Sequence, residues 1–304
     1  MKRHIDPLAT AALIGNVIAV SLIPLFLKYF TPYIDSWTAN GIRYPIGALV
    51  WIPWLWMVFR NGRADRRLWK MALLPTVANI LGQIFWAMTP YYLDPGLISF
   101  MIRLATLWAV LGSFILFQDE RRLLRSPHFW AGFTLAVSGF VVMVLGGRQS
   151  LGSVSAVGIL IVLLASLGWA AYQLTIRRNL SHTDPRTAFG AVSCMTSVGL
   201  VTAMFCAGNP GQALALPSDI VLLVILSGLV GIALSHVLLY FAIRRLGVAI
   251  CSSTNLSGAF LTALLSFHLF GERLTSLQWF AGCMLVAGGV LLVYSQTHLR
   301  KSIS

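Results

Sequence analysis

The sequence predicts an all-α integral membrane protein with ten transmembrane helices, arranged as two inverted five-helix repeats. Three observations lead to this prediction: an apolar composition, ten apolar runs of spanning length, and a similarity between the two halves of the chain. Of the 304 residues, 58% are hydrophobic and 10% are charged, and the mean hydropathy is +0.80. Soluble domains carry roughly 25% charged residues, so this chain has too few polar side chains to cover a globule in water.

The ten apolar runs follow one another with short connections. A bilayer core about 30 Å thick is crossed by roughly 20 apolar residues of helix, and the runs approach that length. They are expected at residues 7–30, 37–59, 70–92, 95–117, 129–146, 154–177, 186–207, 218–243, 247–269 and 276–295. The first run is too long for the apolar core of a signal peptide and has no A-x-A-like cleavage site, which indicates a retained helix.

The distribution of lysine and arginine predicts the orientation. Cytoplasmic loops collect these residues, and 17 of the 22 lie on the cytoplasmic side if both termini are placed there. Three lie on the outer side, and Arg43 and Arg103 lie within spans. The net charge of +13 is therefore spread in short clusters between apolar runs. A nucleic-acid-binding protein would gather it on one surface, so no nucleic-acid partner is expected.

Few residues are placed for metal, cofactor or proton chemistry. No CxxC pair or metal-ligand spacing is present, so neither a metal nor another cofactor is expected. All nine acids fall in loops or at helix ends, which leaves no carboxylate near mid-membrane for a proton relay. The four cysteines lie within apolar runs or at their edges, as small core residues do: Cys194, Cys206, Cys251 and Cys283.

The two halves of the chain resemble each other at an offset of about 152 residues. The matching features are Glu120-Arg121 before Trp130 and Gly132, Glu272-Arg273 before Trp279 and Gly282, the later Gly139 and Gly289, and Gly15-Asn16 with Gly168-Trp169. We therefore expect one repeat over residues 1–150 and a second over 151–304. Because each would hold five spans, an odd number, the second must enter the membrane inverted, as in many secondary transporters.

These features resemble the EamA-type branch of the drug/metabolite transporter (DMT) superfamily. The resemblance covers essentially the whole chain and rests on Gly168-Trp169-Ala170, Arg43 in the second span, and the two Glu-Arg turns with their following glycine helices. Among its groups, the chain is most similar to the YddG group of aromatic amino-acid exporters. The resemblance implies a basket of ten helices, a central cavity and efflux from the cytoplasm of a bacterium. Asn16 departs from the pattern, since many members have an aromatic residue there.

Arg103 is the deepest charged residue and a candidate for substrate binding. It lies eight residues into the fourth span, roughly 12 Å deep at 1.5 Å per residue. A guanidinium at that depth could bind a substrate carboxylate, bond to helix carbonyls, or reach outward to Asp94. Its counterpart in the second half is Asn255, a polar residue at matching depth. Arg43 lies closer to a span end and is expected to have a structural role or to extend its charged group toward the membrane surface.

Two further spans carry polar residues that suit a cavity wall. Asn79, Gln83 and Trp86 in the third span are helically spaced and share one face. Their counterpart region in the eighth span contains Ser235. His236 and Tyr240 lie beside it, one turn apart. His236 could bond a substrate, titrate, or be satisfied by a backbone carbonyl.

The tryptophans fall into an interfacial set and a deeper set. Trp51, Trp54, Trp56 and Trp69 lie near the inner boundary, where an aromatic belt is expected. Trp86, Trp108 and Trp169 lie deeper, and Tyr172 follows Trp169 by three residues. These rings could line a cavity for an apolar or aromatic side chain, or pack between helices.

Glycines in the fifth and tenth spans predict close helix packing. Their spacing of six and seven residues brings them near one face, and small residues let helix backbones approach. The residues are Gly132, Gly139, Gly282, Gly288 and Gly289.

The predicted function is export of amino acids, aromatic or otherwise apolar, and related metabolites across the bacterial inner membrane by alternating access. Both termini would be cytoplasmic, and transport would be of the facilitated or exchange type. The expected partners are a small-molecule substrate and the lipid bilayer, and the protein would be a monomer or a weak homo-oligomer. Alternatives are a carrier of the same fold for an organic cation, nucleobase or nucleotide sugar, and a membrane-embedded transferase. An enzyme is not expected, because its usual acid or histidine clusters are missing.

Overall fold

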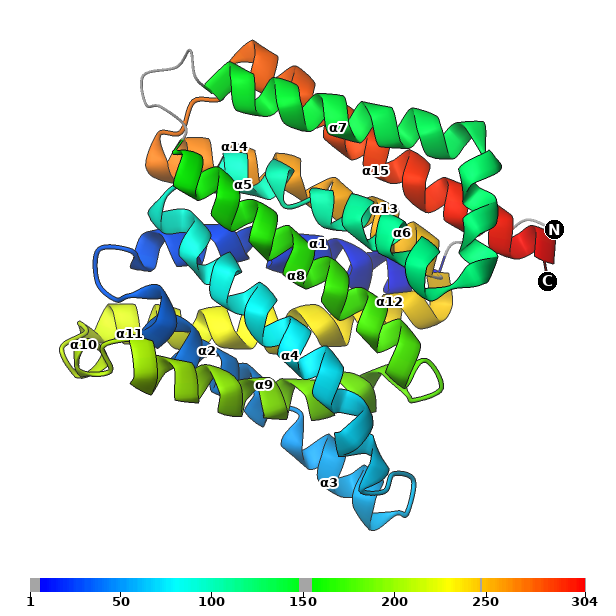
Figure 1. The fold of residues 1–304 in the computed structure, drawn as a ribbon. Helices are drawn as coiled ribbons and strands as arrows, with labels where there is room; N and C mark the ends of the chain where they lie inside the picture. Colours follow the sequence, from blue (N-terminus) through cyan, green and yellow to red (C-terminus); the bar gives the residue numbers. More distant parts are fainter. Residues whose placement is uncertain (1–5, 148–154, 247, 304) are drawn as a thin grey trace.

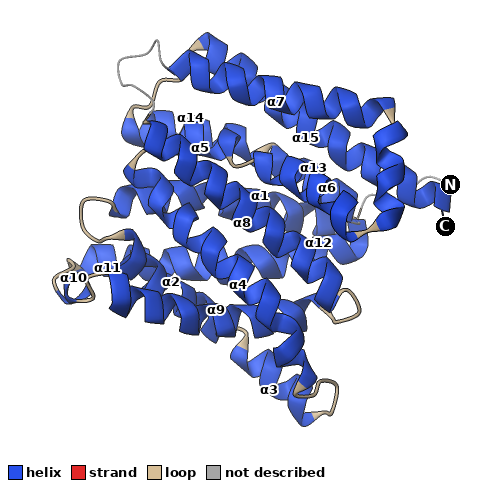
Figure 2. Cartoon of the chain, in the orientation of Figure 1, coloured by secondary structure: helices blue, strands red, loops and turns tan. Residues whose placement is uncertain are grey.

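The structure is a computed structural model that describes residues 6–147, 155–246 and 248–303. Over these residues the chain forms helices and turns, and no β-strand (Figure 2). The unbroken long helices are α1 (Pro7–Phe30), α4 (Arg67–Met88), α7 (Pro127–Gly147), α8 (Ala156–Leu180), α9 (Pro185–Ala207) and α15 (Ser276–Ile303). The boundary expected between residues 150 and 151 lies outside the described residues.

The other spans are interrupted. They consist of α2 (Ser36–Leu49) with α3 (Ile52–Arg60), α5 (Pro95–Met101) with α6 (Leu104–Leu116), α11 (Ser218–Gly228) with a π-helical turn (Leu229–Leu234) and α12 (Ser235–Leu246), and α13 (Val248–Leu256) with α14 (Gly258–Phe270). The short α10 (Gly211–Leu214) and 3-10 segments at Thr89–Tyr91 and Gln118–Arg125 lie in connections.

Apolar segments of spanning length account for most of the described chain. Nine of them are long and apolar enough to cross a membrane, and the α2–α3 pair, bent by 45°, would make a tenth. This confirms the prediction of an all-helical membrane protein. The positions also agree with the sequence, since the first span was expected at 7–30 and α1 is Pro7–Phe30.

Helices from the two halves of the chain pack against each other. The largest pairings are α7 with α15, α4 with α8, α2 with α9, and α1 with α12; α5 also packs on α14 (Figure 1). Glycine makes the α7–α15 approach possible, as predicted: a Cβ added at Gly288 would lie 2.7 Å from the carbonyl oxygen of Gly132. The core is therefore shared between the halves.

Arg43 is held inside this core. It is 2% exposed, and its Nε donates a 2.6 Å hydrogen bond to Ser227 Oγ of α11. The expected structural role agrees with this placement, because the contact joins the second span to the eighth.

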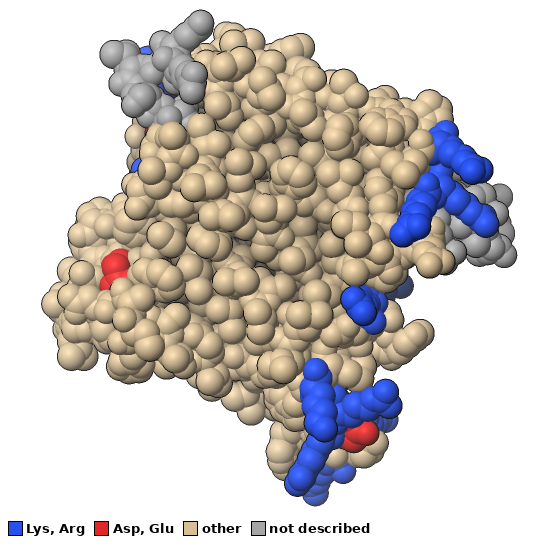
Figure 3. Space-filling view, in the orientation of Figure 1, with Lys and Arg blue, Asp and Glu red and all other residues tan. Residues whose placement is uncertain are grey.

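The visible lysines and arginines gather along one edge of the molecule. In Figure 3 they extend from the edge where Figure 1 places the two termini to the bottom of the view, where α3 lies, and the opposite edge carries few. The broad surface between these edges is largely uncharged, which suits contact with lipid.

Asp35 fastens the start of α2 to the loop that follows α9. Its Oδ1 accepts hydrogen bonds from Trp37 N and Thr38 N at 2.9 Å, and its Oδ2 accepts from Thr38 Oγ1 at 2.7 Å and Asn209 N at 3.0 Å. Burial acts to raise the pKa of Asp35, but these hydrogen bonds outweigh it and hold the pKa below its usual value. The ionised form is therefore the one that the fold stabilises.

Replacing Asp35 with asparagine should lower stability at neutral pH by about 1 kcal/mol. A depressed folded pKa stabilises the protein above the unfolded value of about 3.9, and this contribution is lost as pH falls through the folded pKa. The thermal midpoints of the parent and D35N should therefore differ at pH 7, and the difference should shrink as the pH falls below the unfolded value and through the lower folded pKa. D219N, which changes an exposed acid in the first turn of α11, should show no such difference.

Candidate functional site

Two spans break at matching points, one in each half of the chain. The fourth span breaks between α5 and α6 at Ile102 and Arg103, and the ninth breaks between α13 and α14 at Ser257. The backbone stays hydrogen-bonded at both points, since Ala105 N donates to Ile102 O and Phe260 N donates to Ser257 O, each at 3.0 Å. Interrupted helices at corresponding positions are a common feature of substrate sites in transporters.

The α5 and α14 halves of these spans are joined to each other and to α1. Ser99 Oγ of α5 donates to the carbonyl of Ala259 at 3.1 Å. On α1, Ser21 Oγ donates to Gly258 O at 3.0 Å, while its carbonyl accepts from Thr262 Oγ1 at 2.9 Å. The two breaks are thereby brought to the same region of the interior.

Arg103 lies at this junction. Its Nε donates to Ser99 O at 3.1 Å, and a Cβ added at Gly258 would lie 3.7 Å from its Nη2. Among the described residues nothing accepts a hydrogen bond from its two terminal nitrogens. The bond to Ser99 O is the helix-carbonyl contact that was one alternative for Arg103, whereas Asp94 pairs with Lys28 at 2.9 Å. The guanidinium is positioned by the backbone, with its fork free for an anion.

Two buried amide oxygens near these helices have no hydrogen-bond partner among the described groups. They are Oδ1 of Asn255, half a turn before the α13–α14 break, and Oδ1 of Asn16 on α1. Asn16 Nδ2 donates to Ser235 O at 2.7 Å, which fixes the side chain. Buried acceptors of this kind are normally satisfied, so both are suited to a ligand that donates hydrogen bonds, such as an ammonium group.

An aromatic cluster lies between α2, α9 and α12. The rings of Phe189 and His236 stack with centroids 3.8 Å apart, and Tyr240 and Trp51 meet Phe189 edge-on at 6.1 and 5.3 Å. The His236 Nδ1 lies 2.8 Å from Ile232 O and 3.2 Å from Ser235 Oγ. The ring is therefore held by its own helix, which is one of the roles that the sequence left open.

The predicted interfacial position of Trp51 is wrong. It was expected in the interfacial belt, but it is 4% exposed and belongs to this cluster because the α2–α3 bend turns it inward. Its Nε1 is buried and has no acceptor within the described chain.

Asn79 and its neighbours on α4 face the interior, yet they meet different partners. Asn79 Nδ2 donates to Tyr44 Oη at 2.6 Å and to Thr196 Oγ1 at 3.0 Å, which joins three helices. Gln83 and Trp86 are 8% and 9% exposed. The backbone carbonyl of Gln83 accepts a hydrogen bond from Asn40 Nδ2 at 2.7 Å.

The remaining candidates lie where α8 meets α4 and α6. Trp108 Nε1 donates to Ser166 Oγ at 3.0 Å, and Trp169 and Tyr172 meet edge-on at 6.0 Å. The predicted residues thus fall into more than two groups. Arg103 and Asn255 lie near one another, His236 and Tyr240 belong to the aromatic cluster, and the candidates on α4 and α8 have partners of their own. The partners Tyr44, Thr196 and Ser166 were missed by sequence reasoning; their only signal was a polar group within an apolar run.

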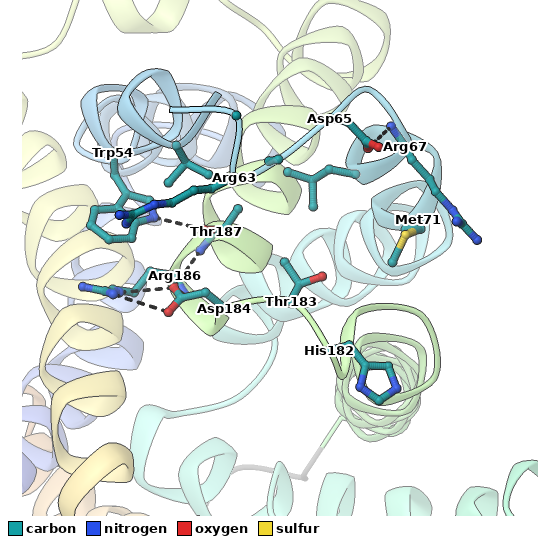
Figure 4. A pocket seen from close by; sticks show the side chains of 14 residues that line it. Trp54, Arg63, Asp65, Arg67, Met71, His182, Thr183, Asp184, Arg186 and Thr187 are labelled. Atoms are coloured by element: carbon teal, nitrogen blue, oxygen red, sulfur yellow. Dashed lines mark hydrogen bonds and ion pairs between the residues drawn. The ribbon is translucent and has the colours of Figure 1, made fainter. Parts of the chain in front are cut away.

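A cavity of about 430 Å³ lies between the α3–α4 loop and the α8–α9 loop (Figure 4). Its walls include Arg63, Arg67 and His182, and its floor is organised around Asp184, whose Oδ1 pairs with Arg186 Nε at 3.2 Å. Burial acts to raise the pKa of Asp184, but the Arg186 guanidinium and backbone hydrogen bonds hold it below its usual value. This loop cavity combines charged walls with apolar side chains such as Leu68 and Met71, and it lies at the basic edge of the molecule. The described residues contain no cluster of three metal-ligating side chains.

The fold defines a membrane protein built of apolar helices, and comparisons with known proteins relate its second half to a family. Residues 156–295 match the EamA-like transporter family. A crystal structure of another protein is 17% identical, with a TM-score of 0.61, and the match covers 97% of this chain and 99% of the other. At that identity the likeness extends to the fold alone. No curated protein matches the sequence.

Proposed function

We propose that the chain is a secondary transporter of the DMT type, with ten spans in two inverted repeats, residues 1–150 and 151–304. The match of residues 156–295 to EamA-like transporters supports the class. The helix pairing supports the repeat: α8 packs on α4 as α1 packs on α12, and α9 packs on α4 as α2 packs on α11. Exchanging the first and second halves reproduces these pairs.

The substrate that best fits the site is a zwitterionic amino acid with an aromatic or other apolar side chain, exported from the cytoplasm of a bacterium. The observation that carries this proposal is Arg103, whose free guanidinium fork lies beside the two helix breaks. It would bind the carboxylate, and Oδ1 of Asn255 or Asn16 would accept from the ammonium. Trp86, Trp108 and Trp169 are the rings we expect near the side chain.

Transport would proceed by alternating access of the two halves around this site. Facilitated or exchange transport is proposed because the acids lie at helix ends and loops rather than mid-membrane. Both termini would be cytoplasmic, as the basic edge favours. The proposal places the protein in the bacterial inner membrane as a monomer or weak homo-oligomer, similar to the aromatic amino-acid exporters.

The test is uptake of radiolabelled tryptophan into proteoliposomes of the purified protein. Saturable uptake without an imposed pH gradient, competed by phenylalanine, is expected. Uptake that requires the gradient would contradict facilitated transport. Uptake of a nucleotide sugar or an organic cation in place of tryptophan, by protein of unchanged thermal midpoint, would replace the amino-acid assignment with the alternative carrier.

A further inference from the structure

A second cavity lies apart from the Arg103 junction, on the side of the helix bundle. It is a groove of about 280 Å³ between the α2–α3 bend and α12, and it adjoins the loop cavity of Figure 4 because Trp54 and Arg186 line both. We call it the lateral groove. Its lining does not include Arg103, Asn255 or Asn16, the residues of the proposed substrate site.

The walls of the lateral groove open toward lipid. Val50 and Val237, one on each side, are 47% and 45% exposed, and the neighbouring Leu49 is 60% exposed. Apolar side chains this exposed within membrane-spanning helices face hydrocarbon. The groove is therefore a recess that an acyl chain can enter from the bilayer.

One end of the groove is cationic. Arg244 lines it, is exposed, and makes no hydrogen bond or ion pair with any described residue. It lies seven residues beyond Val237, about 10 Å further along α12, at the edge where basic residues gather. Arg186 lines the same end, stacked 3.9 Å from the Trp54 ring and paired with Asp184. The adjacent Arg245 is occupied by Asp6 at 2.8 Å, so Arg244 remains the uncompensated charge.

A buried donor without an acceptor lies beside Tyr240, which stands between Val237 and Arg244 on α12. Trp51 lines the groove and is 4% exposed, and its Nε1 has no partner among the described groups. An unsatisfied buried donor is unfavourable, and a ligand with an acceptor at that level would relieve it. The ester carbonyls of a glycerophospholipid lie between its phosphate and its acyl chains, which is the order of groups found here.

We propose that the lateral groove binds a phospholipid of the cytoplasmic leaflet that carries a net negative headgroup. Its phosphate contacts Arg244 and Arg186, an ester carbonyl accepts from Trp51 Nε1, and one acyl chain lies between Val50 and Val237. A free phosphate would leave the apolar walls uncovered, and a zwitterionic lipid would present its own cation to the two arginines.

The experiment measures lipid binding to the delipidated full-length protein in detergent by native mass spectrometry. The probes are dioctanoyl phosphatidylglycerol, dioctanoyl phosphatidylcholine and glycerol phosphate. Phosphatidylglycerol should bind at least 10-fold more tightly than phosphatidylcholine, and glycerol phosphate should not displace it. Equal binding of the two lipids would overturn the proposal. Displacement by glycerol phosphate at equal concentration would show a soluble-anion site in its place.

Matched variants locate the site. R244Q should weaken the binding of phosphatidylglycerol about 10-fold. R245Q should leave this binding unchanged, because Arg245 is paired with Asp6. W51F should weaken it about fivefold, as loss of one hydrogen bond predicts. V237W should fill the groove and abolish tight binding, whereas V198W, on a lipid-facing position of α9 that is 69% exposed, should not. Equal effects of V237W and V198W would exclude the groove as the site.

Discussion

Arg103→Ala should reduce tryptophan binding by at least about 100-fold. A carboxylate held by two charge-assisted hydrogen bonds is stabilised by about 3 kcal/mol, which corresponds to that factor. Uptake in proteoliposomes should fall in parallel. Arg103→Lys should give an intermediate loss, because lysine keeps the charge but not the planar fork.

The comparison of tryptophan with tryptamine separates binding from structure. Tryptamine lacks the carboxylate and should bind the parent protein more weakly than tryptophan does. Its dissociation constant should be the same for the parent protein and for R103A. Equal losses for both compounds would mean that Arg103 acts through its bond to Ser99 O, as a structural residue. R273A, which removes an exposed arginine, should change neither binding constant.

Gly168→Ala should destabilise the protein by about 1–3 kcal/mol, the usual effect of overpacking. A Cβ at Gly168 would lie 2.6 Å from the Cα and 2.7 Å from the N of Gly82, so α8 must move away from the backbone of α4. Because α4 and α8 carry several of the polar and aromatic candidates, tryptophan uptake should decline as well. The thermal midpoint in detergent is the measurement.

Gly146→Ala is the matched control, since a Cβ there would meet side chains of Gln278 and Leu277 no closer than 3.4 Å. It should leave the midpoint nearly unchanged. A similar drop for both variants would show that loss of glycine in a helix, rather than the α4–α8 approach, determines the result. The close packing of α8 on α4 thus explains why the Gly168-Trp169-Ala170 motif begins with glycine.

The spans could be predicted from the sequence because length and apolarity are local properties. The breaks could not, since Ile102 and Ser257 interrupt their helices without proline or glycine at those positions. Trp51 illustrates the same limit: its position along the chain suggested the membrane interface, and the bend after Leu49 turned it into the aromatic cluster.

The polar residues were found more readily than their partners. Asn79 was recognised as an interior residue from its helical spacing, but its hydrogen bonds reach Tyr44 and Thr196, which are 35 and 117 residues away in the sequence. Which polar residues pair depends on how the helices pack, and this cannot be inferred from a single sequence. Arg103 was the exception, because a charge at membrane depth stands out without knowledge of its neighbours.

Glu272 has a consequence for how the protein can move. Its carboxylate accepts from Gly96 N at 2.7 Å and Leu97 N at 2.9 Å, at the start of α5, and Ser99 adds its bond to Ala259. Separating α5 from the α14 segment would break all three hydrogen bonds, two of them to a charged group and each worth about 1.5–3 kcal/mol. We therefore expect α5 and α14 to stay together in any conformational change of the transporter.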